Sequence, residues 1–113
     1  MTVAKKADQA EVVDPLVLAP QIPAVRELED PALRDAILAT WAASLSTSPY
    51  DSLDDVPVSP VMVGRSLLLH INEVNDIALW MLDTLVERFK LKVDRDVALA
   101  TAILHDVDKP LRL

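Results

Sequence analysis

The chain has 113 residues, a formal net charge of −7 and no cysteine. The lack of cysteine excludes disulfide bonds and thiolate metal sites, and the absence of a basic cluster disfavours a nucleic-acid-binding surface. No apolar stretch reaches the roughly 18–20 uninterrupted residues of a membrane span, and the N-terminus is too polar for a signal peptide, so we expect a cytoplasmic protein without membrane contact.

Glycine and proline usage points to a helical fold. One glycine stands against eight prolines, and strict alternation of apolar and polar residues is absent over any useful length. Sheet proteins generally place glycine in turns, whereas this balance favours helices separated by proline-marked breaks. At this length we predict a single all-α domain.

Residues 1–29 are predicted to be a flexible leader. They mix small, charged and proline residues with short apolar patches such as Leu16-Val17-Leu18, and they show no sustained helical period. Residues 30–113 form the predicted helical domain. Its first helix runs from Ala32 to about Ser46, because Asp30-Pro31 combines an N-cap acceptor with proline at the first helical position.

Two further main helices are predicted after a proline- and aspartate-rich loop over residues 49–60. One begins after Ser59-Pro60 and runs to about Phe89. Its seam of apolar residues comprises Leu67, Ile71, Val74, Ala78, Met81, Leu85 and Phe89. The other follows Asp94, a good N-cap, runs to about Asp108 and is stopped by Pro110. Its apolar character nearly all round indicates a buried helix.

The two histidines of the chain fall where these helices can bring them together. His70 lies near the start of the second helix, and His105-Asp106 closes the third. Two imidazoles and a carboxylate suit manganese, iron, nickel, cobalt or zinc, and the mixture alone does not choose among them. Three protein ligands with open positions are typical of a catalytic metal site that activates a water. We therefore predict that His70, His105 and Asp106 bind a divalent metal ion.

The segments around these residues resemble the HD-domain metal-dependent phosphohydrolases. Residues 70–78 are similar to the opening His-x-x-x-Val-x-x-x-Ala helix of that family, and residues 100–109 to its Ala-x-Leu-Leu-His-Asp-Ile-Gly-Lys segment. The resemblance implies an HD-like helical bundle that hydrolyses a nucleotide or another small phosphoester. It also implies that Lys109 contacts a phosphate oxygen of the substrate.

The sequence departs from the family pattern at two points. Asp108 stands where the family commonly has glycine, and the family's final aspartate ligand has no counterpart before Leu113. We therefore expect only the front part of the bundle, incomplete at its C-terminus. The apolar faces of the second and third helices exceed what the first can cover, so we also expect exposed apolar surface and association with itself or a partner chain.

Other interpretations stay open at this point. The chain could be a non-catalytic HD-like signalling or interaction module in which the His-Asp pair is structural, or an iron-dependent oxygenase of the same superfamily. His70 could be an ordinary histidine beside the core, and Lys109 could complement a helix C-terminus. Glu73 could orient the His70 imidazole or carry a proton, or it could be a solvated surface residue. Beyond a metal-activated water, no catalytic group is assigned.

Overall fold

The computed structural model describes residues 12–62 and 64–112. Within these residues the chain is all-α, as predicted, and an isolated antiparallel bridge pairs Pro57 with Ser66. No helix in this part of the chain combines the length and the apolar character that a bilayer span requires.

The first main helix, α2 (Pro31–Thr47), begins where the sequence predicts it. The Asp30 side chain accepts a hydrogen bond from the backbone N–H of Ala32, and Pro31 occupies the first helical position. The buried face of α2 carries Trp41, which is fully enclosed. The other buried residues of this helix are Ile37, Leu38, Ala42, Ser44 and Leu45.

Much of the predicted leader is folded into the core instead of being flexible. Three short helices, α1 (Pro15–Leu18), η1 (Ala19–Gln21) and η2 (Pro23–Glu27), each have a proline in their first turn. Proline is tolerated there because that N–H has no helical partner. The segment buries Leu18, Ile22, Ala24, Val25 and Leu28. Residues 1–11 of the predicted leader lie outside the described residues.

The second main helix, α3 (Leu67–Asp83), starts later than predicted. Before it come a short helix, η3 (Leu53–Asp55), and a loop whose ends are tied by bonds from Val58 N to Arg65 O and from Leu67 N to Val56 O. These bonds pair residues 56–58 with residues 65–67 in place of helical bonds, and the Ser66 side chain caps α3 by accepting from the Leu69 N–H.

The end of α3 continues as a wider turn. A π-helix, η4 (Thr84–Arg88), follows directly and carries the chain to Phe89, so the predicted end of this helical stretch is close to the observed one. Lys90 then adopts a left-handed backbone conformation with φ of 56°, which reverses the chain. The π-helix adds a residue to the turn and rotates the side chains that follow it.

The third main helix, α4 (Arg95–Leu104), is capped by Asp94 as predicted but ends before His105. Residues 105–108 form a turn, and a short helix, α5 (Lys109–Arg112), follows. Pro110 therefore lies within the first turn of a new helix instead of stopping the old one, and its side chain is buried.

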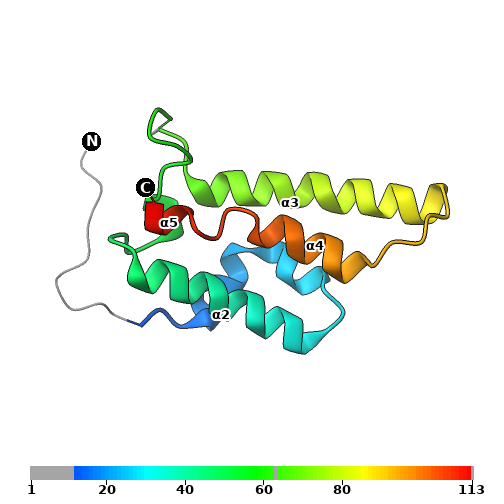
Figure 1. Cartoon of the computed structure of the whole chain (residues 1–113), viewed down its shortest axis with the longest axis horizontal. Helices are drawn as coiled ribbons and strands as arrows, with labels where there is room; N and C mark the ends of the chain where they lie inside the picture. Colours follow the sequence, from blue (N-terminus) through cyan, green and yellow to red (C-terminus); the bar gives the residue numbers. More distant parts are fainter. Residues whose placement is uncertain (1–11, 63, 113) are drawn as a thin grey trace.

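The helices pack around one apolar core. In Figure 1, α3 lies along one side of the molecule, α2 along the other, and α4 runs against α3. The short helix α5 contacts α2, and α1 covers another part of α2. The indole Nε1 of Trp41 donates a 3.1 Å hydrogen bond to the carbonyl of Ile103, which fastens α2 to the end of α4.

A polar contact fastens the N-terminal segment to α4. The carboxylate of Asp96 accepts hydrogen bonds from the backbone N–H groups of Glu29 at 2.9 Å and Asp30 at 3.0 Å. Its neighbour Arg95 donates to the carbonyl of Glu27 at 2.7 Å. The two N–H donors, that of Glu29 first, hold the pKa of the Asp96 carboxyl below its ordinary value.

We expect the stabilising effect of Asp96 to depend on pH. Its pKa is lower in the folded than in the unfolded chain, so its contribution is full above the unfolded value of about 3.9 and is lost as pH falls through the lower folded pKa. The free energies of unfolding of the parent and of Asp96→Asn, measured with urea, should differ at pH 6 and converge as the pH is lowered toward 2.5. Asp35→Asn, an exposed control on α2, should show no such convergence.

The contribution of the Trp41 hydrogen bond to stability can be measured by comparing Trp41→Phe with the same substitution at Trp80. Trp41→Phe removes the donor to a buried carbonyl and should lower the free energy of unfolding by about 2 kcal/mol. Trp80 is 70% exposed, so Trp80→Phe should change it by less than about 0.5 kcal/mol. Urea unfolding followed by far-ultraviolet circular dichroism measures both. Equal effects would contradict this assignment.

Candidate metal centre

The structure brings His70, His105 and Asp106 together, and the three side chains could hold a metal ion. Each offers one ligand atom, and these atoms all lie within 4.8 Å of one another. His70 comes from the first turns of α3, His105 directly follows α4, and Asp106 is the next residue in the turn. Residues separated by 35 positions thus meet because α3 and α4 pack side by side.

One carboxylate oxygen is the centre of the group. Asp106 Oδ2 lies 3.1 Å from His70 Nε2 and 2.9 Å from His105 Nε2. The Asp106 side chain is only 12% exposed, whereas the two imidazoles are about one-third exposed. The carboxylate therefore forms the floor of the group, and the histidines form a rim that solvent or a ligand can reach.

The position of the His-Asp pair depends on how α4 ends. Trp41 and Ser44 of α2 each bond a carbonyl there: Trp41 Nε1 donates to Ile103 O at 3.1 Å and Ser44 Oγ to Val107 O at 2.5 Å. The Ile103 carbonyl lies in the last turn of α4, where carbonyls lack helical partners, and the Val107 carbonyl lies in the turn that follows; the two donors satisfy them. They also fix the turn on both sides of residues 105 and 106.

The hydrogen bond of His105 favours a positive species between its ring and the carboxylate. His105 Nδ1 lies 2.6 Å from the carbonyl of Ala102, which requires Nδ1 to carry a proton. In a neutral imidazole, Nε2 then presents a lone pair to Asp106 Oδ2, and two lone pairs repel unless a proton or a metal ion lies between them. Metal-binding histidines commonly donate their other N–H to a backbone carbonyl in this way. The donor set therefore fits a divalent cation.

Lys109, predicted to bind substrate, lies at the edge of the same group. Its Nζ is 3.4 Å from Asp106 Oδ2 and donates a 3.0 Å hydrogen bond to the carbonyl of Val58. The ammonium thus places a positive charge beside the carboxylate and ties the loop before α3 to the start of α5. Its side chain is 20% exposed.

Two acidic neighbours lie outside the group. Glu73 forms an ion pair with Arg65, and within the described residues neither a hydrogen bond nor an ion pair joins it to His70. Asp108, the residue that differs from the HD pattern, pairs with Arg112 at 2.8 Å. Neither contact supports a role for these carboxylates as ligands.

Sequence reasoning missed the residues that support the group from outside. Trp41 and Ser44 stand three positions apart on the buried face of α2, but nothing in their spacing indicates that they bond carbonyls near the histidine. The Val58 carbonyl is a backbone group in a loop, so no side-chain pattern marks it.

Comparisons of the chain with protein-family models, curated proteins and solved structures give no match. The interpretation of the site therefore depends on its own residues and their geometry.

Metal binding can be measured directly. We expect the purified chain, loaded with manganese, iron, nickel, cobalt or zinc, to retain one ion, because three ligand atoms converge on one point. His70→Ala and His105→Ala should each weaken binding at least about tenfold, since each removes a ligand. Asp108→Asn changes a neighbouring acid outside the group and should bind like the parent.

Elemental analysis after dialysis and calorimetric titration both report this result. Retention of metal by both histidine variants would place the ion elsewhere.

Proposed function

We propose that this chain is a metal-dependent phosphohydrolase of the HD type that acts on a nucleotide or another small phosphoester. The observation that carries the proposal is the convergence of two imidazoles and one carboxylate on a single point, with a lysine ammonium beside them. The local sequence pattern around both histidines, which resembles that of HD domains, supports the same conclusion.

Each residue has a role that its position supports. His70, His105 and Asp106 would hold the ion, and a bound divalent cation supplies an acidified water and neutralises phosphoester charge. The Ala102 carbonyl orients the His105 ring so that Nε2 faces Asp106. Asp106 is the least exposed of the three, so it would determine how far below the surface the ion lies.

Lys109 would bind a non-bridging phosphate oxygen of the substrate. Its ammonium lies against Asp106, where an anionic group bound at the rim would find a second positive charge. An ammonium has three donors. Among the described residues, two groups contact the Lys109 ammonium, the Val58 carbonyl and the Asp106 carboxylate, so within this part of the chain one donor is left for substrate.

A non-catalytic role is the second candidate, and a specific observation favours it. Asp106 Oδ2 already has three nitrogen neighbours, from His70, His105 and Lys109. If the imidazoles are protonated, this network satisfies the partly buried carboxylate and joins α3, α4 and α5 without an ion. The group would then stabilise an interaction module instead of acting on a phosphoester.

Hydrolysis of bis(p-nitrophenyl) phosphate with added manganese separates the two candidates. We expect metal-dependent release of p-nitrophenol that falls at least about 100-fold in Asp106→Asn, since loss of this ligand removes the positioned ion. Lys109→Gln should raise KM more than it lowers kcat, because the lysine binds substrate charge. Asp108→Asn is the matched control and should keep the parent activity.

A chain that binds manganese at this site yet hydrolyses neither the diester, p-nitrophenyl phosphate nor nucleoside triphosphates would refute the enzymatic proposal. A chain that retains no added metal at His70, His105 and Asp106 would instead support the structural network.

A further inference from the structure

The inner side of α3 buries amide groups that have no hydrogen-bond partner among the described residues. The two asparagines of the chain, Asn72 and Asn75, both lie on this helix. Asn75 is 1% exposed, and both its Oδ1 and its Nδ2 are buried without a partner. The Oδ1 of Asn72 and the Oε1 of Gln21, in η1, are buried in the same way. Such atoms are rare in folded proteins, so they need an explanation.

One hydrogen bond and the helical repeat place these side chains beside one another. The Nδ2 of Asn72 donates a 3.0 Å hydrogen bond to the backbone carbonyl of Gln21, so η1 touches α3 at this point. Asn75 follows Asn72 by three positions, and side chains at this spacing are neighbours on a helix, with Cβ atoms about 5–6 Å apart. We refer to Gln21, Asn72 and Asn75 as the α3 amide cluster.

Rotation of the asparagine amides does not supply the missing partners. At Asn75 both ends of the amide lack a partner, so exchanging its oxygen and nitrogen changes nothing. At Asn72 the exchange would turn the oxygen toward the Gln21 carbonyl, and two acceptors would then face each other. Among the described residues the cluster therefore has three buried oxygens without a donor and, at Asn75, one buried NH2 group without an acceptor.

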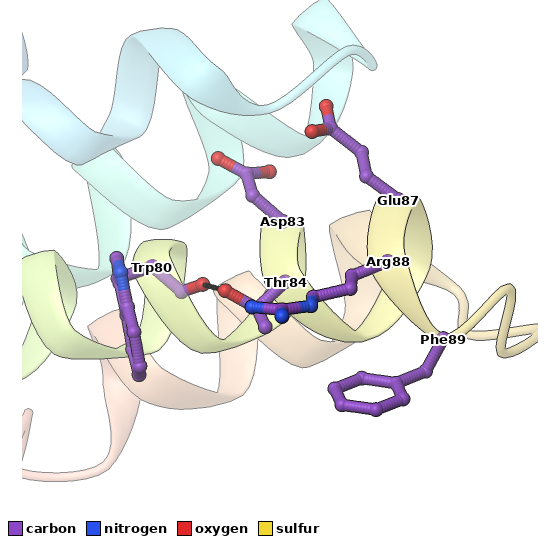
Figure 2. Close-up of a pocket in the computed structure, with 6 residues that line it drawn as sticks. All are labelled: Trp80, Asp83, Thr84, Glu87, Arg88 and Phe89. Atoms are coloured by element: carbon purple, nitrogen blue, oxygen red, sulfur yellow. Dashed lines mark hydrogen bonds between the residues drawn. The ribbon is translucent and has the colours of Figure 1, made fainter.

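Polar side chains at the far end of this helical stretch have protein or solvent partners. Thr84 donates a 2.8 Å hydrogen bond to the carbonyl of Trp80, and the exposed Glu87 and Arg88 line an open pocket of about 480 Å³ (Figure 2). Asparagine is also unfavourable inside a helix, because its amide competes for backbone groups. Two asparagines within α3 that bury amide atoms therefore need a partner other than the described side chains.

The chemistry of the unpaired atoms selects the partner. Most of them are acceptors, so the partner must donate hydrogen bonds, and the NH2 group of Asn75 requires that it also accept one. Water does both, and internal waters typically make about three hydrogen bonds to polar groups that would otherwise be unsatisfied. The free-energy cost of burying an unpaired amide exceeds the cost of immobilising such a water.

Other occupants fit the cluster less well. A sodium or potassium ion is coordinated by oxygen atoms and accepts no hydrogen bond, so it would leave the NH2 group of Asn75 unpaired. An organic ligand would have to reach an amide that lies in the core of the protein, where Asn75 is only 1% exposed.

We propose that the α3 amide cluster holds at least one internal water molecule, which bridges the amide of Asn75 to its neighbours in the cluster. The water accepts a hydrogen bond from Asn75 Nδ2 and donates to amide oxygens of the cluster. It thereby joins η1, in the N-terminal segment, to α3 within a core that is otherwise mostly apolar.

The inference does not depend on the metal centre. Asn75 lies five positions beyond His70, which is about 140° around the helix. Among the described residues, no hydrogen bond joins the α3 amide cluster to the His70–His105–Asp106 group. Metal binding and phosphoester hydrolysis can therefore fail while the water site is present, and the reverse also holds.

Nuclear magnetic resonance of the full chain, labelled with nitrogen-15, tests the proposal directly. The sequence has four carboxamides, those of Gln9, Gln21, Asn72 and Asn75, so the side-chain NH2 signals are few. The signals that disappear in Asn75→Leu belong to Asn75, and triple-resonance spectra of the parent give the same assignment if that variant does not fold. In the parent, the Asn75 NH2 protons should show cross-peaks to water of opposite sign in NOE and ROE spectra.

Opposite signs identify a long-lived bound water and distinguish it from proton exchange with the solvent. Cross-peaks of equal sign, or none, would show that no such water lies against Asn75 and would overturn the proposal.

Oxygen-17 relaxation dispersion counts the long-lived waters independently of any assignment. Asn75→Leu should lose at least one water relative to the parent, because leucine offers no hydrogen bond. Asp76→Asn, at an exposed position next to Asn75, should keep the parent count. A folded Asn75→Leu with the parent count would contradict a water at this cluster.

Salt identity covers the remaining occupant. The midpoint of thermal unfolding of the parent should vary among sodium, potassium and choline chloride no more than that of Asn75→Leu does. A rise in sodium or potassium chloride that Asn75→Leu abolishes would assign a metal cation to the α3 amide cluster and overturn the proposal.

Discussion

The site depends on one constraint, which is that side chains of α2 hydrogen-bond a carbonyl in the last turn of α4 and another in the turn that follows it. Trp41 and Ser44 bond the carbonyls of Ile103 and Val107, and the residues between them form a turn in place of further helix. His105 keeps right-handed helical backbone angles at the end of α4, and its Nε2 lies 2.9 Å from Asp106 Oδ2 in the turn that follows. The core tryptophan is thus also a support of the candidate metal centre.

The group itself is balanced between two states that share one geometry. Three nitrogen atoms lie within 3.4 Å of Asp106 Oδ2, which is an arrangement that protons or a metal ion can each complete. The hydrogen bond between His105 Nδ1 and the Ala102 carbonyl determines that Nε2 is the ring nitrogen that faces the Asp106 carboxylate. An ion held by this group would therefore depend on a backbone carbonyl of α4 as well as on the three side chains.

The sequence predicts those features that local chemistry decides. The N-caps Asp30 and Asp94 mark their helices correctly, and the spacing of His70 and His105-Asp106 on neighbouring helices anticipates that they meet. Features that depend on distant partners are not predictable in this way. Leu18, Ile22 and Val25 are buried by helices that follow them, although the prolines among them suggest a flexible segment. The start of α3 is likewise set by bonds across the loop before it, and Pro110 begins a helix because α5 packs on α2.

The contact of Asp96 with residues 29 and 30 has a consequence for how the chain folds. It joins positions that are 66 and 67 residues apart, and the bond from Trp41 to Ile103 spans 62. Contacts between such distant positions slow folding, because a long loop must close before they form. During synthesis, α1, η1 and η2 emerge long before α4, so their apolar residues stay without their final cover until α4 has left the ribosome. The risk of aggregation therefore persists through the synthesis of α2 and α3 and falls when the segment that contains Asp96 becomes available.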